Sequence, residues 1–161
     1  MEKIEFIRLD NAELPDWDEI PGLFNEMYAR MDEMGLMVPL AADGAQKWLR
    51  STRNTAGKFG IVVLARIGEV PVGFAHGMIK FLPDYLGNHS VGLITHVFVK
   101  DIARKKGLGR ELVKMLEGWF HDKNVHSIEL QVINDNLPAQ KFWENLGYRV
   151  ELTQYRKIRS K

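Results

Sequence analysis

The chain has 161 residues, of which 45% are hydrophobic and 27% charged, with no cysteine and a net charge of +1. This length suits a single domain over residues 1–161, and the absence of cysteine excludes disulfides, thiol nucleophiles and thiolate metal sites. A net charge of +1 is smaller than phosphate-backbone binding generally needs, and no apolar run approaches the roughly 18 residues of a membrane span, so we expect neither nucleic acid nor membrane as a partner.

The first third of the chain predicts one strand and two helices. Residues 1–6 alternate charged and apolar side chains without the apolar block of a secretory signal, so we expect a cytoplasmic protein whose first strand lies near residues 4–8. Apolar side chains then recur at helical spacing from Trp17 to about Met34. After a loop at 36–42, Asp43 stands where it can cap a shorter helix that ends near Arg53.

The middle of the chain predicts strands joined by hairpins. β-Branched residues dominate 61–67, a second run follows at 70–80, and a third covers 91–99. Gly68 in the first turn position suits a type II′ hairpin between the first two runs. The stretch 83–89 is rich in turn residues and separates the second run from the third.

The last third alternates helices with strands. Apolar residues from Leu108 to Trp119 fall on one helical face, and 126–132 alternates as a strand. Asn136 can cap a further helix that Gly147 stops, and residues 148–158 predict one or two closing strands. The fold class is therefore α+β (mixed α/β), with a mixed, mostly antiparallel sheet of about 6–7 strands and helices on both faces.

The turn between the third strand run and the following helix has the features of an anion site. A helix start exposes unpaired N–H groups and partial positive charge, and no Ser, Thr, Asp or Asn occupies 104–110 to cap it. Gly107 and Gly109 let a phosphate approach the backbone. Basic residues in the same turn can bind a pyrophosphate; they are Arg104, Lys105, Lys106 and Arg110.

Two other phosphate motifs do not fit this turn. A dinucleotide fingerprint needs a third glycine where Leu112 stands, and no G-K-[ST] of a P-loop occurs. A basic run at a helix start can also be ordinary solvated surface, an interpretation that the flanking glycines disfavour.

Two sequence blocks resemble the GNAT superfamily of acyl-CoA-dependent N-acyltransferases. Residues 104–109, Arg-Lys-Lys-Gly-Leu-Gly, match the [QR]-x-x-G-x-[GA] signature. Residues 136–148, Asn-Leu-Pro-Ala-Gln-Lys-Phe-Trp-Glu-Asn-Leu-Gly-Tyr, match a second block of the form N-x-x-A-x-x-F-[YW]-E-x-x-G-[FY]. The order of elements also resembles the GNAT fold, so the resemblance covers nearly the whole chain.

The resemblance implies acetyl-CoA as the cofactor, with CoA as product. The strand residues Val97, Phe98 and Val99 would line the pantetheine arm, and backbone groups of Val97 and Val99 would bind it as an added strand would. The turn would hold the pyrophosphate through Arg104, Lys105, Lys106, Gly107, Leu108, Gly109 and Arg110. Asn136, Ala139, Phe142 and Trp143 would flank the pantetheine and thiol end.

The catalytic groups follow less directly from the resemblance. The tyrosine with which the family often protonates the departing thiolate is replaced here by Trp143, which leaves Tyr148 as the favoured acid and Tyr155 and Tyr85 as alternatives. The family's base positions correspond to Leu93 and Thr95, which do not titrate near neutral pH. His96 is adjacent and would turn toward them only if the strand bulges. His76, His89 or a water molecule are the other candidates for the base.

Two hypotheses for the function remain open at this point. The first is transfer of acetyl to a primary amine of a small molecule or protein; the second is a catalytically idle acyl-CoA sensor or partner-binding module. Residues 1–50 carry eleven acidic and five basic side chains, which favours a cationic acceptor if these acids line the acceptor site. We expect no metal, because the five histidines lack paired ligand spacing, and a homodimer is a common assembly in the family.

Overall fold

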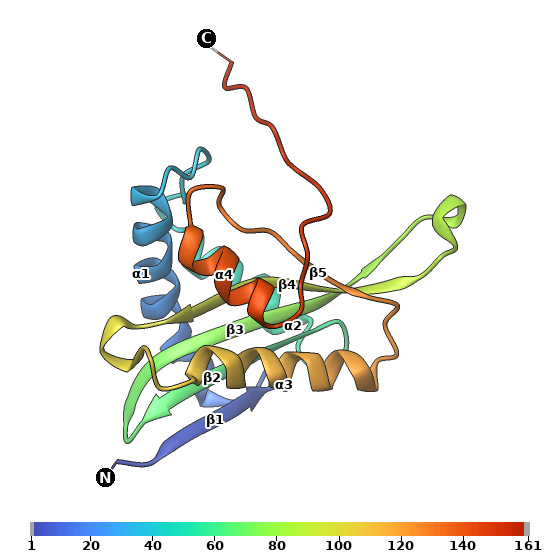
Figure 1. Cartoon of the computed structure of the whole chain (residues 1–161). Coiled ribbons are helices and arrows are strands. Elements are labelled where there is room, and N and C mark those ends of the chain that lie inside the picture. The colour runs from blue at the N-terminus through green and yellow to red at the C-terminus, as the bar shows by residue number, and fades with distance from the viewer. Residues whose placement is uncertain (1, 160–161) are drawn as a thin grey trace.

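The structure is a computed structural model and describes residues 2–159. Its centre is a five-stranded sheet in the order β1-β2-β3-β4-β5 (Figure 1). The strands are β1 (Ile4–Leu9), β2 (Gly60–Ile67), β3 (Val70–Phe81), β4 (Ser90–Val99) and β5 (Ile128–Leu130). The first four pair antiparallel, and β5 runs parallel to β4.

The turn between β2 and β3 is the expected hairpin. Ile67 pairs with Val70, Gly68 has a φ of +60°, and Glu69 keeps a negative φ. This combination is the backbone pattern of a type II′ turn, which only glycine adopts readily in its first position.

Two helices cover one face of the sheet. They are α1 (Ile20–Glu33), which follows a 3-10 turn at Pro15–Glu19, and α2 (Gly44–Asn54). Phe24 and Leu49 from these helices pack with Phe74 and Phe98 from the sheet in one apolar cluster. Asp43 precedes α2 but forms no cap hydrogen bond and instead pairs with Lys47 at 3.2 Å, so this part of the capping prediction is wrong.

The other face carries α3 (Leu108–Asp122) and α4 (Leu137–Asn145). Phe120 of α3 packs directly on two glycines, because a Cβ built on Gly77 or on Gly92 would lie 2.7 Å from its ring. The close contact holds α3 against β3 and β4, and α4 lies beside α3 in Figure 1. The helices therefore cover both faces, as the sequence predicted.

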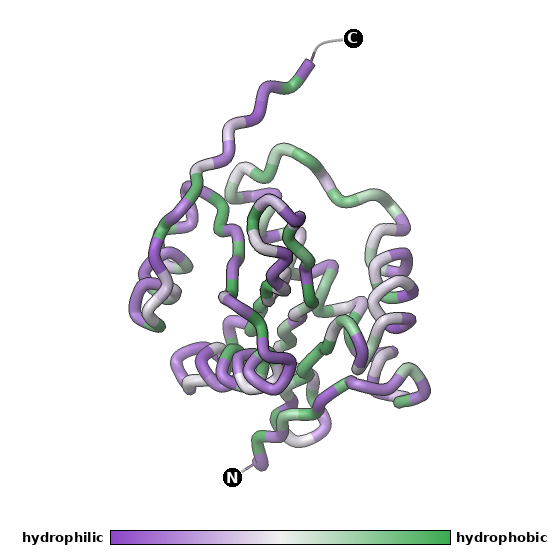
Figure 2. Tube along the Cα trace, turned by 90° about the vertical axis from the view of Figure 1, so that its right-hand side faces the viewer, coloured by the Kyte–Doolittle hydropathy of each residue, from purple (hydrophilic) through white to green (hydrophobic). Residues whose placement is uncertain are grey.

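The predicted number of six or seven strands is wrong. Among residues 2–159 the sheet has five, because residues 148–158, predicted as one or two closing strands, form no strand. They run as an extended chain away from the sheet (Figures 1 and 2). Within the described part of the chain, no helix has the length and apolarity to cross a membrane.

Candidate functional site

The turn at 104–110 begins α3 with free backbone donors. Gly107 is the N-cap with a φ of +77°, and no side chain caps the helix. Lys105 has a φ of +65°, a backbone conformation that costs a non-glycine residue about 1 kcal/mol or more. Strained residues beside exposed N–H groups are typical of anion-binding turns, so the local geometry suits a phosphate.

The same turn lies next to β4 and α4. A Cβ built on Gly109 would lie 3.5 Å from the Phe142 ring and 4.0 Å from Val99 Cγ2. The pairing of β4 with β5 ends at Ile94 and Leu130, while β4 continues to Val99. Residues 95–99 therefore present an edge without a strand partner among the described residues, where an extended ligand can bind the backbone.

The three strand residues predicted to line this edge have different environments. Val97 and Val99 are half-buried and pack against the apolar cluster that contains α3. Phe98 points to the opposite face, where it is buried in the α1 cluster with the Arg30 guanidinium 5.5 Å from its ring. Its contribution to the edge is therefore backbone only.

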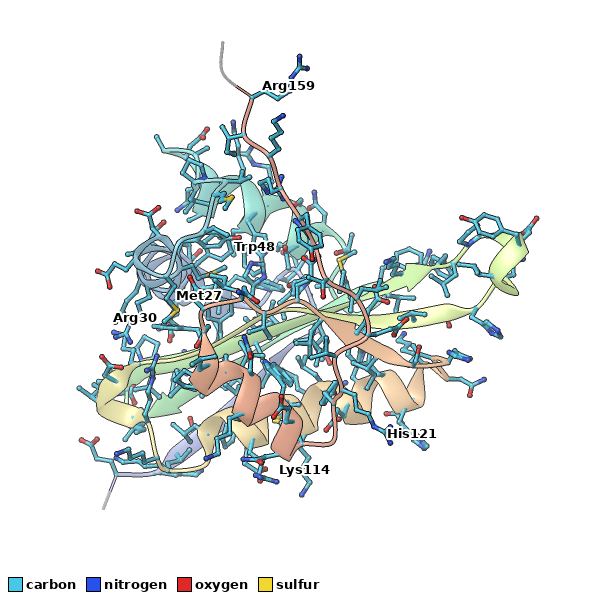
Figure 3. The ribbon with its side chains drawn as sticks, turned by 45° about the horizontal axis from the view of Figure 1, so that its top comes forward. Met27, Arg30, Trp48, Lys114, His121 and Arg159 are labelled. Atoms are coloured by element: carbon cyan, nitrogen blue, oxygen red, sulfur yellow. The ribbon has the colours of Figure 1, made fainter. Side chains whose placement is uncertain are left out.

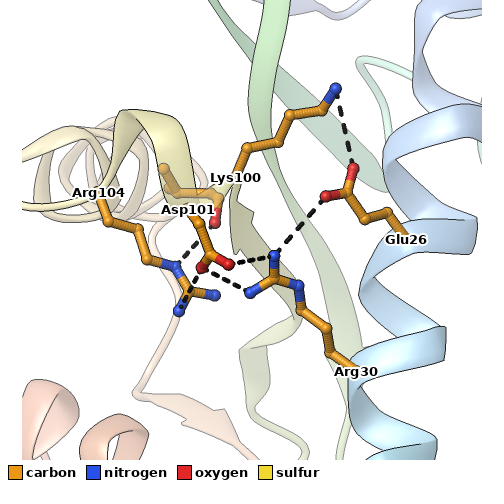
Figure 4. Close-up of polar contacts among 6 residues, drawn as sticks. Glu26, Arg30, Lys100, Asp101 and Arg104 are labelled. Atoms are coloured by element: carbon orange, nitrogen blue, oxygen red, sulfur yellow. Dashed lines mark hydrogen bonds and ion pairs between the residues drawn. The ribbon is translucent and has the colours of Figure 1, made fainter.

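Arg104 is exposed but bound to neighbouring groups of its own chain. Its Nε donates to the Val99 carbonyl at 3.0 Å, and its Nη1 lies 3.1 Å from Asp101. Asp101 also accepts two hydrogen bonds from Arg30 of α1, at 2.7 and 2.8 Å (Figure 4). These contacts tie α1 to the turn and occupy Nε and Nη1 of Arg104.

The other basic side chains of the turn are unpaired. Lys105, Lys106 and Arg110 are exposed and form no ion pair with any residue in 2–159. They remain available to an anionic ligand, whereas Arg104 would have to leave Asp101 or bind through its outer nitrogen.

Helix α4 is built as the sequence predicted. The Asn136 side chain accepts a hydrogen bond from the Ala139 N–H at 3.2 Å and caps the helix, and Gly147 follows it with a φ of +93°. Phe142 and Trp143 are half-buried, with ring centroids 5.0 Å apart, and both pack against the α3 cluster. The α4 block thus lies on the same face as the turn.

Tyr148 lies on this face as well, but it is not adjacent to His96. Its hydroxyl donates to Glu117 of α3 at 2.9 Å, and its ring lies 5.1 Å from that of Trp143. Burial and the Glu117 carboxylate raise the pKa of Tyr148 above its ordinary value. The side chain borders a cavity of about 540 Å³ near the C-terminal ends of α3 and α4 that includes none of the other predicted site residues.

His96 lies on the α1–α2 face, and a bulge places it there. His76 pairs with His96 and Gly77 pairs with Ile94, so Thr95 is an extra residue in β4. Thr95 Oγ1 lies 2.5 Å from His76 Nδ1 and 2.6 Å from His96 Nδ1. The bulge thus joins two histidines through one hydroxyl, and the two predicted catalytic residues, His96 and Tyr148, lie against opposite faces of the sheet.

Both histidines are neutral near pH 7. Burial lowers the pKa of His76 to about 3, helped by the neighbouring His96, and burial lowers the pKa of His96 to about 4. Thr95 carries one hydroxyl proton, so it donates to one histidine and accepts from the other. When it donates to His76, His96 Nδ1 holds a proton, and the lone pair of His96 Nε2 faces the Tyr28 hydroxyl 3.4 Å away.

Sequence reasoning missed the aromatic residues around His96. The Tyr28 hydroxyl lies 3.4 Å from His96 Nε2, and the Trp48 ring meets the His96 ring edge-on with centroids 5.3 Å apart. Phe24 stacks on Trp48 at 4.6 Å. Figure 3 shows Trp48 on α2 facing the sheet. Their helical spacing indicated core residues, and nothing local distinguishes Tyr28 and Trp48 from the rest of that stripe.

Several acidic side chains of residues 1–50 form ion pairs within the protein. Arg66 of β2 bonds both Asp16 and Glu19, and Glu26 lies 3.7 Å from Arg30 and 3.8 Å from Lys100. These acids were among those expected to attract a cationic acceptor, and their charge is balanced locally. Residues 2–159 contain no group of three or more His, Asp or Glu placed to hold a metal ion.

The sequence matches the Acetyltransferase (GNAT) family over residues 17–148. It is 33% identical over 73 residues to the uncharacterized protein YxbD of Bacillus subtilis (strain 168). That match covers 40% of this chain and 46% of YxbD, so the chain spans less than half the length of this relative.

Several solved structures have the same fold. Aminoglycoside N-acetyltransferase AAC(6′)-Iy in complex with CoA matches with a TM-score of 0.76 at 17% identity, over 98% of this chain and 96% of that one. The aminoglycoside acetyltransferase meta-AAC0020 from an uncultured soil metagenomic sample, in complex with sisomicin, gives 0.71 at 14% identity, over 98% and 97%. Ribosomal-protein-alanine N-acetyltransferase from Brucella melitensis biovar Abortus 2308 gives 0.70 at 18% identity, over 98% and 100%.

Proposed function

Because the chain belongs to the acetyltransferase (GNAT) family, we propose that it transfers an acetyl group from acetyl-CoA to a primary amine and releases CoA. One observation carries the proposal most directly: the uncapped start of α3 lies beside the unpaired edge of β4 and the Phe142 ring of α4. A pyrophosphate and an extended amide-bearing arm need those two features side by side.

The residues present fit acetyl-CoA. The N–H groups of 105–110, with Lys105, Lys106 and Arg110, would hold the pyrophosphate, and Gly109 places no side chain between its own N–H and a phosphate. The edge of β4 at 95–99 would bind the arm, with Phe142 and Trp143 as apolar neighbours. When bound, acetyl-CoA supplies a thioester whose acetyl group is activated toward amines.

His96 is proposed as the base that takes the proton from the acceptor amine. The neutral imidazole that the structure favours can accept a proton at Nε2 when Thr95 accepts from His96 Nδ1 and donates to His76. The amine nitrogen would bond to the acetyl carbon as the carbon–sulfur bond breaks, His96 Nε2 would hold the amine proton, and the departing thiolate would take a proton from Tyr148 or from water. His76 acts through Thr95 and is a positioning residue, because it selects the tautomer of His96.

The acid that protonates the leaving sulfur is proposed to be Tyr148, the favoured candidate from the sequence. Its hydroxyl would have to release Glu117 before it could donate elsewhere, since the 2.9 Å bond occupies its one proton. Direct uptake of a proton from water by the thiolate would leave Tyr148 with a structural role. A Tyr148→Phe variant with unchanged kcat would assign that structural role.

The acceptor is proposed to be a cationic small molecule or a protein amine. The partly exposed rings of Tyr28 and Trp48 near His96 support this choice, because aromatic faces attract ammonium groups. The similar solved structures include an acetyltransferase of aminoglycosides and a ribosomal-protein-alanine N-acetyltransferase. Their acceptors are a small-molecule amine and a protein amine, respectively. We propose a cytoplasmic protein in which residues 1–161 form one catalytic domain, and a homodimer as its assembly.

The decisive experiment measures thiol release from acetyl-CoA with a panel of amines, together with calorimetric binding of acetyl-CoA. Thiol release that depends on an amine, and a His96→Gln variant that binds acetyl-CoA normally with a kcat lower by at least tenfold, support the proposal. Tight cofactor binding without release for any amine would favour the alternative, an idle acyl-CoA sensor. A diamine and a neutral amine of similar size, compared at two salt concentrations, test the cationic preference, which predicts a higher kcat/KM for the diamine at low salt.

A further inference from the structure

The chain between α1 and α2 begins with seven apolar residues, 34–40, here named the apolar loop. They read Met-Gly-Leu-Met-Val-Pro-Leu, without a charged, hydroxyl or amide side chain. Met34, Met37 and Val38 are 38%, 58% and 54% exposed. Figure 2 shows hydrophobic colouring along the chain that arches above the sheet at this loop. A contiguous apolar patch in contact with water is typical of a binding surface.

The apolar loop continues the aromatic surroundings of the proposed base. Leu40 packs in the same apolar cluster as Tyr28 and Trp48, and Met31 joins them there. Tyr28, Met31 and Met34 follow one another at intervals of three along α1 and into its C-cap, so they share one side of the helix. These side chains and the apolar loop form one surface, here named the apolar wall.

Within residues 2–159, no carboxylate affects the reacting end of this wall at His96. Burial lowers the pKa of His96 to about 4, whereas a carboxylate beside the ring would raise it. The acids that precede the loop, Asp32 and Glu33, are exposed at the end of α1, where water and salt screen their charge. The wall therefore offers an acceptor apolar and aromatic contact rather than an ion pair.

The chemistry of the wall selects the body of the acceptor. A hydroxyl-rich body, such as that of an amino sugar, would lose water from its hydroxyl groups, and the side chains of 34–40 offer them no hydrogen bond. An apolar body gains by leaving water, and an aromatic ring gains further from contact with Tyr28 and Trp48. The flexible methionine side chains of the loop can adapt to its shape.

We propose that the acceptor is a small primary amine with an apolar body, such as an aralkylamine, whose body lies against the apolar wall. The amine nitrogen faces His96, and the ring packs with Tyr28 and Trp48. Met37 and Val38 cover its outer side. The inference rests on the proposed acetyl transfer, and it narrows the acceptor from cationic amines in general to those whose ammonium group is carried by an apolar body.

Two primary amines of similar length but different bodies test the proposal. With saturating acetyl-CoA, 2-phenylethylamine should have a kcat/KM roughly tenfold or more above that of 2-(2-aminoethoxy)ethanol, because the apolar wall stabilises only the first body. Thiol release that favours the polar amine overturns the acceptor class and leaves acetyl transfer intact. An absence of release with every amine overturns acetyl transfer and this inference together.

Substitutions in the loop separate the wall from the chemistry. Met37→Ser combined with Val38→Ser should lower the preference for 2-phenylethylamine at least fivefold, mainly through KM, while calorimetric binding of acetyl-CoA stays unchanged. Both side chains are more than half exposed, so the variant should fold. Val70→Ser, at a 49% exposed residue that begins β3, is the matched control and should keep the parent's preference.

An unchanged preference in the double variant overturns the proposal. So does a parent dimer that becomes monomeric in this variant, because a second copy of the chain would then be what covers the apolar loop.

Discussion

Acidification should destabilise the folded protein through His96, and the structure sets the size of the effect. Burial lowers the pKa of His96 to about 4 from an ordinary value of 6.5. A histidine whose folded pKa lies below its unfolded pKa contributes a penalty as the pH falls, because the unfolded chain binds the proton first. The loss therefore begins near pH 6.5 and levels off below about pH 4.

The magnitude follows from the two pKa values. One pH unit below the unfolded value, at pH 5.5, the unfolded state gains about 1.4 kcal/mol from protonation of this one histidine, and at pH 4 and below the loss approaches roughly 3 kcal/mol. Urea unfolding at pH 7.5 and pH 5.5 measures this loss of unfolding free energy. His96→Gln cannot take up the proton, so its drop in unfolding free energy between these pH values should be smaller than that of the parent by about 1.4 kcal/mol.

A matched control is available in His121, which is exposed on α3. His121→Gln should lose as much stability between pH 7.5 and pH 5.5 as the parent does. If His96→Gln also loses as much as the parent, then His96 is not held neutral by its surroundings, and the proton arrangement with Thr95 and His76 is wrong.

Three further predictions concern the cofactor site. Gly109→Val should weaken acetyl-CoA binding by at least tenfold in calorimetry. Gly109→Ala should bind nearly normally, since a single Cβ there meets Phe142 at 3.5 Å and Val99 at 4.0 Å, both ordinary contacts. Equal binding by the valine variant would place the phosphate elsewhere. Trp143→Phe should keep kcat within about tenfold, because the indole packs between Phe142 and Tyr148 without a proton to transfer, and a fall of several orders of magnitude in a folded variant would give it a direct role. EDTA should leave the activity unchanged, and a loss that zinc restores would contradict this.

Much of the cofactor side could be predicted from the sequence because its determinants are local. The helix start at Gly107, the cap at Asn136 and the stop at Gly147 each depend on residues within a few positions, and each lies where the pattern placed it. The engagement of Asp101 by both Arg104 and Arg30 could not be predicted in this way, since Arg30 is contributed by a helix about seventy residues earlier.

The acceptor side required knowledge of strand register. His76 and His96 face each other across β3 and β4, and the turn-rich stretch between these strands is centred on Leu86, which is equally far from both histidines. That symmetry was a usable signal for their pairing. The placement of Thr95 between the two histidines could not be predicted, because a bulge adds one residue to a strand without changing the residue types in a run of β-formers.

The closing strand shows why alternation alone does not determine a fold. Residues 148–158 carry strand-forming side chains, and the pattern predicted one or two closing strands, yet residues 149–158 are exposed and form no strand. A period of two residues indicates that a segment suits a pleated surface, but it does not say which strand would pair with it. A strand also needs a hydrogen-bonded neighbour, and the backbone of residues 149–158 has none within residues 2–159, so the side-chain pattern alone did not place this segment in the sheet.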